Sequence, residues 1–324
     1  MKVTAVTVTY GNRFEYLKQV LDALVFLKID SICVVLNGIN KDVFHKIKRF
    51  KKYEFIHFLD LKENTGSANG FAEGIKLATE IENDFIWLLD DDNLPQEKAL
   101  ITLKEYWKNI DDDEKNNKIA LLSYREDRQV YKRAIQEKNK FLMLGRSNSF
   151  LGFDLNKLFK KNNNSRFNKN ITSGKVIVAP YGGTFFHKAL IDGIGLPNKD
   201  FFLYGDDYDF SYRIFLKGGY IKLILESKIE DLEKSFHLKK TRGIFNTRFF
   251  LTDSKTRLYY NIRNNIIFEQ NFVTNKLKYR FNKSLYFLFT FILLILKPKH
   301  FWKYLLLFRA VNDAKSFLKK NNVR

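Results

Sequence analysis

Two hydrophobic patterns alternate along the first 110 residues, and this alternation restricts the fold more than any other feature of the sequence. Short β-branched and apolar runs, typical of buried strands, are separated by segments with the spacing of amphipathic helices. Such alternation predicts an α/β fold with a parallel, doubly wound sheet that binds ligands at the carboxyl ends of its strands. The strand patterns cover 3–9, 31–36, 55–59 and 84–89. A helix is expected at 13–26, and another follows the Gly-containing segment at 64–70 and ends at about 81.

Beyond residue 110 the patterns are less regular. Strands are predicted at 119–124 and 220–225, and a helix is predicted at 210–216. The polar, Asn-rich stretch at 160–170 is typical of a mobile loop. The length of 324 residues fits one large domain with an appendage, and the sequence has no internal repeat.

The C-terminal part is basic and rich in apolar residues. Of the net charge of +20, residues 232–324 contribute 20 Lys and Arg against 4 Asp and Glu, a net of +16. Such asymmetry indicates a polyanionic partner, either nucleic acid or anionic lipid. The apolar run at 285–296 is shorter than the roughly 20 residues that span a bilayer. With cationic ends and an amphipathic segment at 301–311, it predicts a helix lying in a membrane interface. A core helix or a dimer contact is the alternative.

The N-terminus and the cysteine content bear on the compartment. Residues 3–9 form a strand pattern directly after Lys2, with no cleavage site of a signal peptide. The one cysteine, Cys33, lies in an apolar run and is expected to be a core residue, so no disulfide can form within the chain. Both observations predict a cytoplasmic protein.

Three consecutive carboxylates, Asp90-Asp91-Asp92, directly follow a predicted buried strand. Alternate residues of an extended segment point the same way, so Asp90 and Asp92 are expected to converge while Asp91 points elsewhere. Two convergent carboxylates can bind a hard divalent cation, which in turn can hold a diphosphate. Helix capping by Asp92 or Asn93 is the alternative, but it explains one acidic residue rather than three.

A second acidic motif, Asp206-Asp207, follows the aromatic residues of 201–204 and precedes Tyr208. Carboxylates in an apolar setting have raised pKa values, and one of them can act as a general base. The alternative is an acidic first helical turn stabilised by the helix dipole.

Taken together, these motifs resemble the family 2 inverting glycosyltransferases of the GT-A fold, a Rossmann-like, mostly parallel sheet flanked by helices. The likeness covers roughly residues 1–265 and includes the front motif at 6–13, Asn64-Thr65-Gly66 and both acidic motifs in the expected order. More narrowly, the segments at 87–95 and 205–213, with 259–265, resemble the galactofuranosyl- and rhamnosyltransferase branch.

The resemblance implies roles for particular residues. Asp207 would be the catalytic base, with Asp206 as its support, and Asp90, Asp92 and His237 would bind Mn²⁺ or Mg²⁺. The acceptor is expected near Gly182, Gly183 and Tyr204, although a plain turn explains the two glycines as well. The nucleotide-sugar donor would contact Thr9, Arg13, Asn37, Asn64, Gly66, Asp90 and Asp91.

We therefore expect a GT-A domain at 1–265, with a nucleotide-binding half at 1–110 and an acceptor half at 111–265. Residues 266–324 are expected to form a helical extension that docks on the anionic inner face of the cell membrane. The expected reaction transfers galactofuranose from UDP-galactofuranose to a lipid-linked glycan of a bacterial surface polysaccharide, such as O antigen or capsule; rhamnose or another hexose is the alternative. A basic membrane- or nucleic-acid-binding protein without catalysis is the rival, but the chain has no recognisable nucleic-acid-binding motif.

Overall fold

The computed structural model describes residues 1–157, 171–233 and 248–321, and its contacts divide the chain into two compact units. The first unit comprises the described residues of Met1–Lys140, Phe167–Phe202 and Asp206–Ser235. The second comprises those of Phe141–Arg166, Leu203–Gly205 and Phe236–Arg324. The boundaries expected at 110 and 265 stay predictions, and the contact division already includes 248–265 in the second unit.

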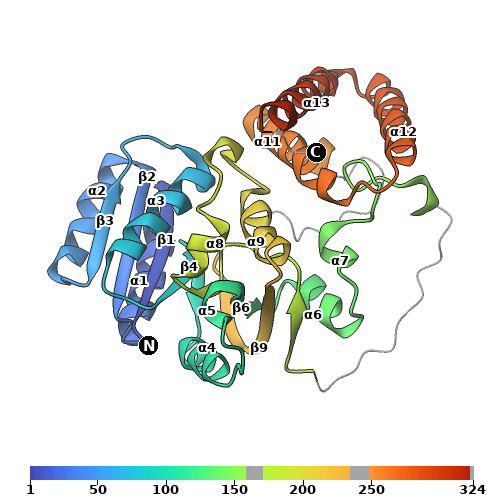
Figure 1. Ribbon diagram of the computed structural model, residues 1–324. Helices are drawn as coiled ribbons and strands as arrows, with labels where there is room; N and C mark the ends of the chain where they lie inside the picture. The colour runs from blue at the N-terminus through green and yellow to red at the C-terminus, as the bar shows by residue number, and fades with distance from the viewer. Residues whose placement is uncertain (158–170, 234–247, 322–324) are drawn as a thin grey trace. The chain divides into compact units, whose positions relative to one another are not determined.

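The first half of the first unit alternates strands and helices, as predicted from the sequence (Figure 1). Strand β1 pairs in parallel with β2 and β4, and β2 pairs in parallel with β3, so the prediction of a parallel sheet is confirmed here. These elements are β1 (Val3–Gly11), α1 (Phe14–Phe26), β2 (Ser31–Ile39), α2 (Lys41–Ile47), β3 (Ile56–Asp60), α3 (Gly66–Glu80) and β4 (Phe85–Asp90).

The second half of this unit continues the sheet with both strand directions. Strand β8, which the sequence patterns did not reveal, pairs antiparallel with both β4 and β6, while β6 and β9 are parallel. Among the described residues the sheet has nine strands in the order β3-β2-β1-β4-β8-β6-β9-β5, with β7 beside β9. The elements are β5 (Asn93–Pro95), α4 (Ala99–Lys108), α5 (Lys115–Lys118), β6 (Ile119–Arg125), α6 (Gln129–Gln136), β7 (Ser173–Val176), β8 (Thr184–His187), α8 (Leu190–Ile194), α9 (Asp206–Leu216) and β9 (Tyr220–Asp231).

Alternate residues of the strands point to opposite sides of the sheet, and helices cover both faces. Val3 and Ala5 of β1 join the hydrophobic cluster that α1 and α4 complete. Val6 and Val8 lie instead against α3, whose Gly74 and Gly70 have no side chain to keep the helix away. Cys33 is fully buried in β2, as expected of a core residue, and burial raises the pKa of its thiol to about 12.

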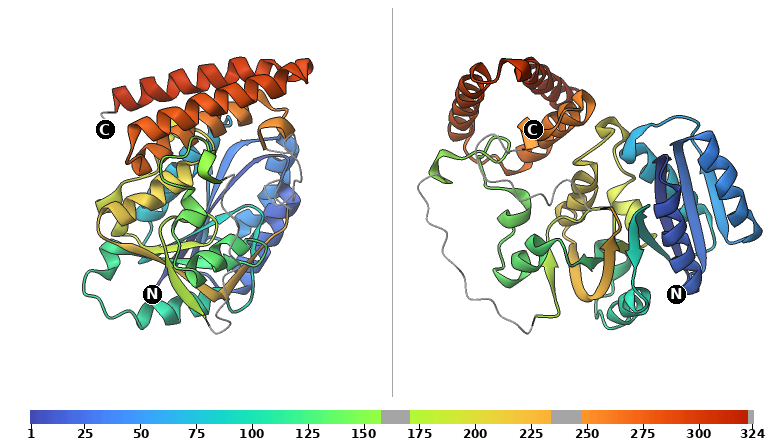
Figure 2. Two further views of the ribbon diagram at one scale, coloured as in Figure 1. Left: turned by 90° about the vertical axis from the view of Figure 1, so that its right-hand side faces the viewer. Right: turned by 180° about the vertical axis from the view of Figure 1, so that it is seen from behind.

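The second unit is helical and contains the predicted C-terminal extension. Its helices are α7 (Phe141–Leu144), α10 (Arg248–Leu251), α11 (Lys255–Glu269), α12 (Lys276–Ile295) and α13 (Trp302–Lys320). Helix α13 packs on α11, where Tyr259 donates a hydrogen bond to Asp313, and on α12, where the rings of Phe287 and Phe308 are 4.8 Å apart. Figure 2 shows the long helices of this unit running side by side.

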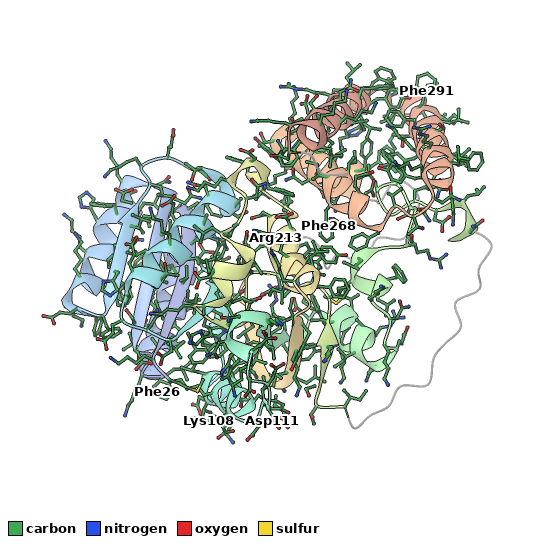
Figure 3. The ribbon with its side chains drawn as sticks, viewed as in Figure 1. Phe26, Lys108, Asp111, Arg213, Phe268 and Phe291 are labelled. Carbon is green, nitrogen blue, oxygen red and sulfur yellow. The ribbon has the colours of Figure 1, made fainter. Side chains whose placement is uncertain are left out.

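Helix α12 and the following segment expose an unusual amount of apolar surface. Phe291 is labelled on α12 in Figure 3, and more than a third of its side chain is exposed. The other large exposed apolar side chains between the start of α12 and the end of α13 are Leu277, Phe281, Leu288, Phe289, Ile292, Ile295, Leu296, Phe301, Leu305 and Phe308. In the described parts of the chain, no helix has the length and apolar character needed to cross a membrane.

Candidate active site

The two acidic motifs, distant in the sequence, meet in the first unit at the carboxyl end of β4 and the N-terminus of α9. Withdrawal from solvent and the nearby charges of Asp231, Asp91 and Asp207 together raise the pKa of Asp90 to about 6, against the opposing effect of Arg125. The charge of Asp90 is also one of the causes that raise the pKa of Asp206. Electrostatic coupling of this kind requires proximity, so the carboxylates of both motifs share one site.

Asp91 has partners of its own. Its Oδ2 accepts a hydrogen bond from the Thr9 hydroxyl at 2.7 Å, and both of its oxygens lie 2.9 Å from Nε of Arg13. Asp91 is only 3% exposed, and Arg13 is stacked near the rings of Tyr10 and Tyr16. Three residues expected to contact the nucleotide thus bind one another, and they fix the start of α1 to the end of β4.

Asp90 and Asp92 are the two carboxylates expected to hold a metal. Withdrawal from solvent and the charge of Asp90 raise the pKa of Asp92 to about 7, while Arg13, at 3.3 Å, opposes this. Two mutually repelling carboxylates offer the hard oxygen ligands that Mg²⁺ and Mn²⁺ accept, and Mg²⁺ commonly takes one or two carboxylates plus substrate phosphates. Within the described residues no group of three or more His, Cys, Asp or Glu could hold a metal ion, and His237 lies outside them.

Asn37 shapes the Gly-containing loop at the start of α3. Its amide nitrogen donates to the carbonyl of Gly66 at 2.9 Å, and its amide oxygen accepts from the N–H of Thr65 at 2.8 Å. Asn64 accepts a bond from the N–H of Gly66. Gly66 has a φ of +83°, and a Cβ there would lie 2.1 Å from the carbonyl oxygen of Phe202, so only glycine fits. The buried Asn37 therefore fixes the loop, while Asn64 is exposed beside it.

The two glycines of the expected acceptor site lie immediately before β8. A Cβ on Gly182 would lie 1.9 Å from Oδ1 of Asn93 and 2.7 Å from Oδ2 of Asp90. Gly183 donates its N–H to the carbonyl of Leu88 on β4. Gly182 thus lets the first acidic motif approach the main chain closely. The sequence had suggested either contact with a ligand or a plain turn for this glycine.

The second acidic motif forms the first turn of α9. Asp206 is 2% exposed and accepts a hydrogen bond from Ser67 at 2.9 Å, which opposes the effect of burial; the net result is a pKa of about 6. Withdrawal from solvent and the charge of Asp206 raise the pKa of Asp207 to about 7. A carboxylate with a pKa near neutrality suits general-base chemistry. Tyr204 belongs to the second unit, where its carbonyl accepts a bond from Asn264.

A buried charge network that sequence reasoning missed surrounds Asp90. Asp231, at the end of β9, accepts bonds from Asn93, Arg125 and Arg128 at 2.8, 3.2 and 3.0 Å. Arg125 also lies 3.8 Å from Asp90, and its charge lowers the pKa values of Asp90 and Asp207. The position of Arg125 directly after a predicted strand was the available signal. The sequence offered no such signal for Asp231, because the strand that carries it was expected to end at residue 225.

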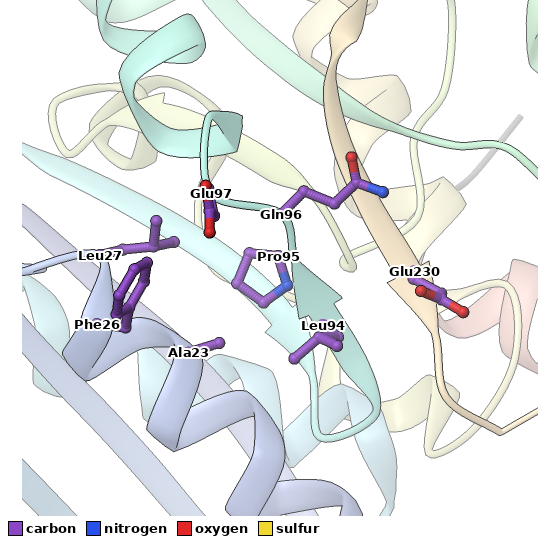
Figure 4. A pocket seen from close by; sticks show the side chains of 8 residues that line it. All are labelled: Ala23, Phe26, Leu27, Leu94, Pro95, Gln96, Glu97 and Glu230. Carbon is purple, nitrogen blue, oxygen red and sulfur yellow. The ribbon is translucent and has the colours of Figure 1, made fainter.

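A separate hollow of about 340 Å³ lies on the first unit between α1 and β5 (Figure 4). It is lined by Phe26, Pro95, Glu97 and Glu230, among other residues, and by none of the carboxylates of the two acidic motifs. This hollow is therefore distinct from the candidate active site.

The curled sheet flanked by helices, with acidic motifs where its strands end, defines a GT-A type α/β protein. The model of the family described as "Glycosyl transferase family 2" matches residues 4–190, which is more than half of the chain. The chain therefore belongs to glycosyl transferase family 2. No curated protein matches it.

Solved structures also resemble the chain. A crystal structure of GalNAc-T7 with UDP, GalNAc and Mn²⁺ matches with a TM-score of 0.52 and 12% identity, over 82% of this chain and 48% of that one. The chain thus spans about half the length of GalNAc-T7, and at this identity the likeness concerns the fold. TarS of S. aureus, residues 1–349 in complex with UDP-GlcNAc, matches with a TM-score of 0.47 and 14% identity, over 84% and 74% of the two chains; so distant a match carries no argument.

Proposed function

We propose that this protein is an inverting glycosyltransferase that moves a sugar from a nucleotide donor to a hydroxyl group of a glycan, with Asp207 as its base. The observation that carries the proposal is the meeting of the two acidic motifs in one site, at the carboxyl end of β4 and the first turn of α9, where burial raises the pKa of Asp207 to about 7. Membership of glycosyl transferase family 2 supports the reaction class.

In the proposed reaction, the acceptor hydroxyl oxygen attacks the anomeric carbon of the donor and the hydroxyl proton passes to Asp207. The bond between the anomeric carbon and the diphosphate oxygen breaks, so the nucleoside diphosphate leaves and the configuration inverts. Asp207 must be ionised to accept the proton, and Arg125 favours that form. Asp206, held by Ser67, favours the neutral form and so keeps the base near neutrality. General-base assistance contributes about 10²–10⁴-fold.

The donor is proposed to bind where β1, β4 and α3 present polar groups. The floor of this donor site would be formed by Thr9, Arg13 and Asp91. The loop that Asn37 holds, which contains Asn64 and Gly66, would lie beside the nucleotide base. Asp90 and Asp92, together with His237, would hold Mn²⁺ or Mg²⁺. A metal bound there would neutralise charge that develops on the leaving diphosphate.

The identity of the donor is proposed more narrowly as a UDP-sugar. GalNAc-T7, which shares the fold, is described with UDP, GalNAc and Mn²⁺. Within this class, UDP-galactofuranose is the first candidate, on the resemblance to the galactofuranosyltransferase branch, and rhamnose or another hexose is the alternative. Discrimination among such sugars depends on a few pocket contacts.

The acceptor is proposed to be a lipid-linked glycan reached from the cytoplasmic face of the membrane. The exposed apolar side chains of α12 and α13 and the basic residues on the same helices support a peripheral anchor. Each Lys or Arg near an anionic surface contributes about 1 kcal/mol. These contributions support peripheral binding without a spanning helix.

The test is release of nucleoside diphosphate from a panel of UDP-, dTDP- and GDP-sugars, each with Mn²⁺ or with EDTA, in the presence of lipid-linked acceptors. Turnover of one donor that EDTA abolishes is the expected result and names the sugar. Turnover that persists in EDTA would remove the metal from the mechanism. If none of the donors turned over, the proposed function would be wrong.

A further inference from the structure

A pocket of about 500 Å³ is lined entirely by residues of the second unit. Its volume is in the range of small-molecule sites. Phe268, labelled on α11 in Figure 3, is one of its residues. The lining consists of Met143, Leu144, Gly145, Ser149, Leu151, Gly152, Phe153, Phe249, Leu258, Asn261, Ile262, Asn265, Phe268, Glu269 and Tyr286.

One wall of the pocket is a face of α11 that carries a polar group on each of three successive turns. Asn261, Asn265 and Glu269 follow one another at intervals of four residues, which places them on the same side of the helix. The amide nitrogen of Asn265 donates to the main-chain carbonyl and the side-chain oxygen of Asn261. These bonds use neither the amide nitrogen of Asn261 nor the amide oxygen of Asn265, so within the described part of the chain a donor and an acceptor are left for a ligand.

Glu269 adds a group with both donor and acceptor character. Its Oε1 accepts a hydrogen bond from the Tyr279 hydroxyl at 2.7 Å, and its Oε2 accepts one from the N–H of Leu151 at 2.9 Å. Withdrawal from solvent raises the pKa of its carboxyl to about 8, although both bonds and the charge of Lys283 oppose the shift. At neutral pH the group is therefore mostly an uncharged acid that holds a proton.

The rest of the lining is aromatic and aliphatic, with Phe153 and Tyr286 near one another and Leu258 and Ile262 on α11. The described residues that line the pocket include no Lys or Arg, so nothing in the lining compensates the charge of a phosphate. A plain hydrocarbon chain fits no better. It would remove Asn261, Asn265 and Glu269 from water without replacing their hydrogen bonds, at a cost of about 1–3 kcal/mol for each group left unsatisfied.

A sugar ring meets both requirements, because its C–H faces are apolar and its hydroxyl groups both donate and accept. We propose that this pocket is a saccharide subsite, which binds a neutral sugar residue through Asn261, Asn265 and Glu269. The assignment rests on the proposed function in one respect: the bound sugar is taken to be part of the acceptor glycan, at a residue that does not react.

The experiment is saturation-transfer NMR on the full chain with methyl glycosides of galactose, rhamnose and N-acetylglucosamine, and separately with hexanol. The variants are Asn261→Leu, Asn265→Leu and the double variant, which keep side-chain size but remove the hydrogen bonds. Asn265 is exposed, so its replacement should not disturb folding. Asn312→Leu is the matched control, since Asn312 is an exposed asparagine on α13 that does not line the pocket.

The expected result is binding of at least one glycoside that weakens about tenfold or more in the double variant and is unchanged in Asn312→Leu. Glycoside binding that is equal in the wild type and the double variant, or absent throughout, would overturn the subsite. So would hexanol binding that strengthens in the double variant, because the pocket would then accept hydrocarbon.

Donor hydrolysis measured on the same samples separates this inference from the proposed function. Hydrolysis without glycoside binding removes the subsite and leaves the transferase intact. Glycoside binding that the variants weaken supports the subsite even if no donor is hydrolysed.

Discussion

The two units differ in where they place clusters of carboxylates and of large apolar side chains. In the first unit, Asp91, Asp206 and Asp231 are buried together with the guanidinium of Arg125, while the large apolar side chains fill the two faces of the sheet. In the second unit, α12 exposes Leu288, Ile292 and many other apolar side chains to solvent. A cluster of carboxylates thus lies inside the first unit, and a large set of exposed apolar side chains lies on α12 and α13 of the second.

The contrast separates two kinds of function. Burying like charges in one site costs free energy, and a protein retains such an arrangement chiefly where shifted pKa values are needed for chemistry. Exposing a row of large apolar side chains costs solubility, and it is typical of surfaces that bind a membrane or another protein. We therefore expect the first unit to carry the reaction and the second to carry the attachment, and four measurements test this division.

The largest expected effect follows from replacing the base. Asp207→Asn keeps the shape of the side chain but removes its ability to take a proton, so the transfer rate should fall by about 10²–10⁴-fold. The measurement is nucleoside diphosphate release with saturating donor and acceptor. Asp209→Asn is the control, because Asp209 is on the same turn of α9 but pairs with Arg213. Equal losses in the two variants would mean that the acidic turn serves the helix rather than the chemistry.

The next effect concerns attachment. Ile295 and Leu296 are 57% and 69% exposed, and burying each in a lipid interface contributes about 1.5–3 kcal/mol. Ile295→Asp with Leu296→Asp should therefore weaken cosedimentation with phosphatidylglycerol vesicles by about 100-fold or more. Phe26→Asp, at an equally exposed position (67%) on the first unit, should leave it unchanged. If both changes weakened binding alike, apolar exposure on α12 would have no special role.

A smaller effect is expected at Gly182. Gly182→Ala would force a methyl group against Asn93 and Asp90, and such overpacking costs about 1–3 kcal/mol. Turnover should fall by about tenfold or more. Gly193→Ala is the comparison, because the nearest atom to its new methyl group is the carbonyl oxygen of Asn117 at 3.7 Å. Unchanged turnover in Gly182→Ala would show that Asp90 does not need its observed position.

The smallest effect is on stability. The pKa of Asp207 is about 7 in the folded chain against about 3.9 unfolded, so the folded state binds the proton more tightly. The resulting stability is complete below about pH 4 and is lost as the pH rises through 7. Asp207→Asn cannot ionise, so in EDTA it should raise Tm at pH 8 and leave Tm at pH 4 unchanged. A lower Tm at pH 8 would contradict the repulsion among the carboxylates.

The fold of the first unit was largely predictable because its signals are local. The runs at 3–9, 31–36 and 84–89 are strands, and the apolar face of the first helix is buried, including Leu17 and Leu21. The short strand β8 was missed because four residues within an aromatic stretch carry no period of their own. The extension was predicted as helical, but α12 begins at Lys276, well before the apolar run at 285–296.

The charge network of the site was less predictable because it depends on pairing between distant strands. Arg125 and Asp231 meet because β6 and β9 are parallel with a register shift between Ser123 and Tyr124. No local pattern in a single sequence specifies such a shift. The bonds from Thr9 and Arg13 to Asp91 were equally hard to predict. The motifs indicated that these residues lie near one another, but not which of them would pair.

The buried thiol of Cys33 has a practical consequence. It is the one cysteine in the sequence, it is fully buried, and its pKa of about 12 keeps it protonated and unreactive at neutral pH. A cysteine introduced at an exposed position would therefore be the single site that a maleimide spin label or fluorophore could modify. Labels placed in turn along α12 would report the depth of each position in a vesicle, without any need to alter the natural residue first.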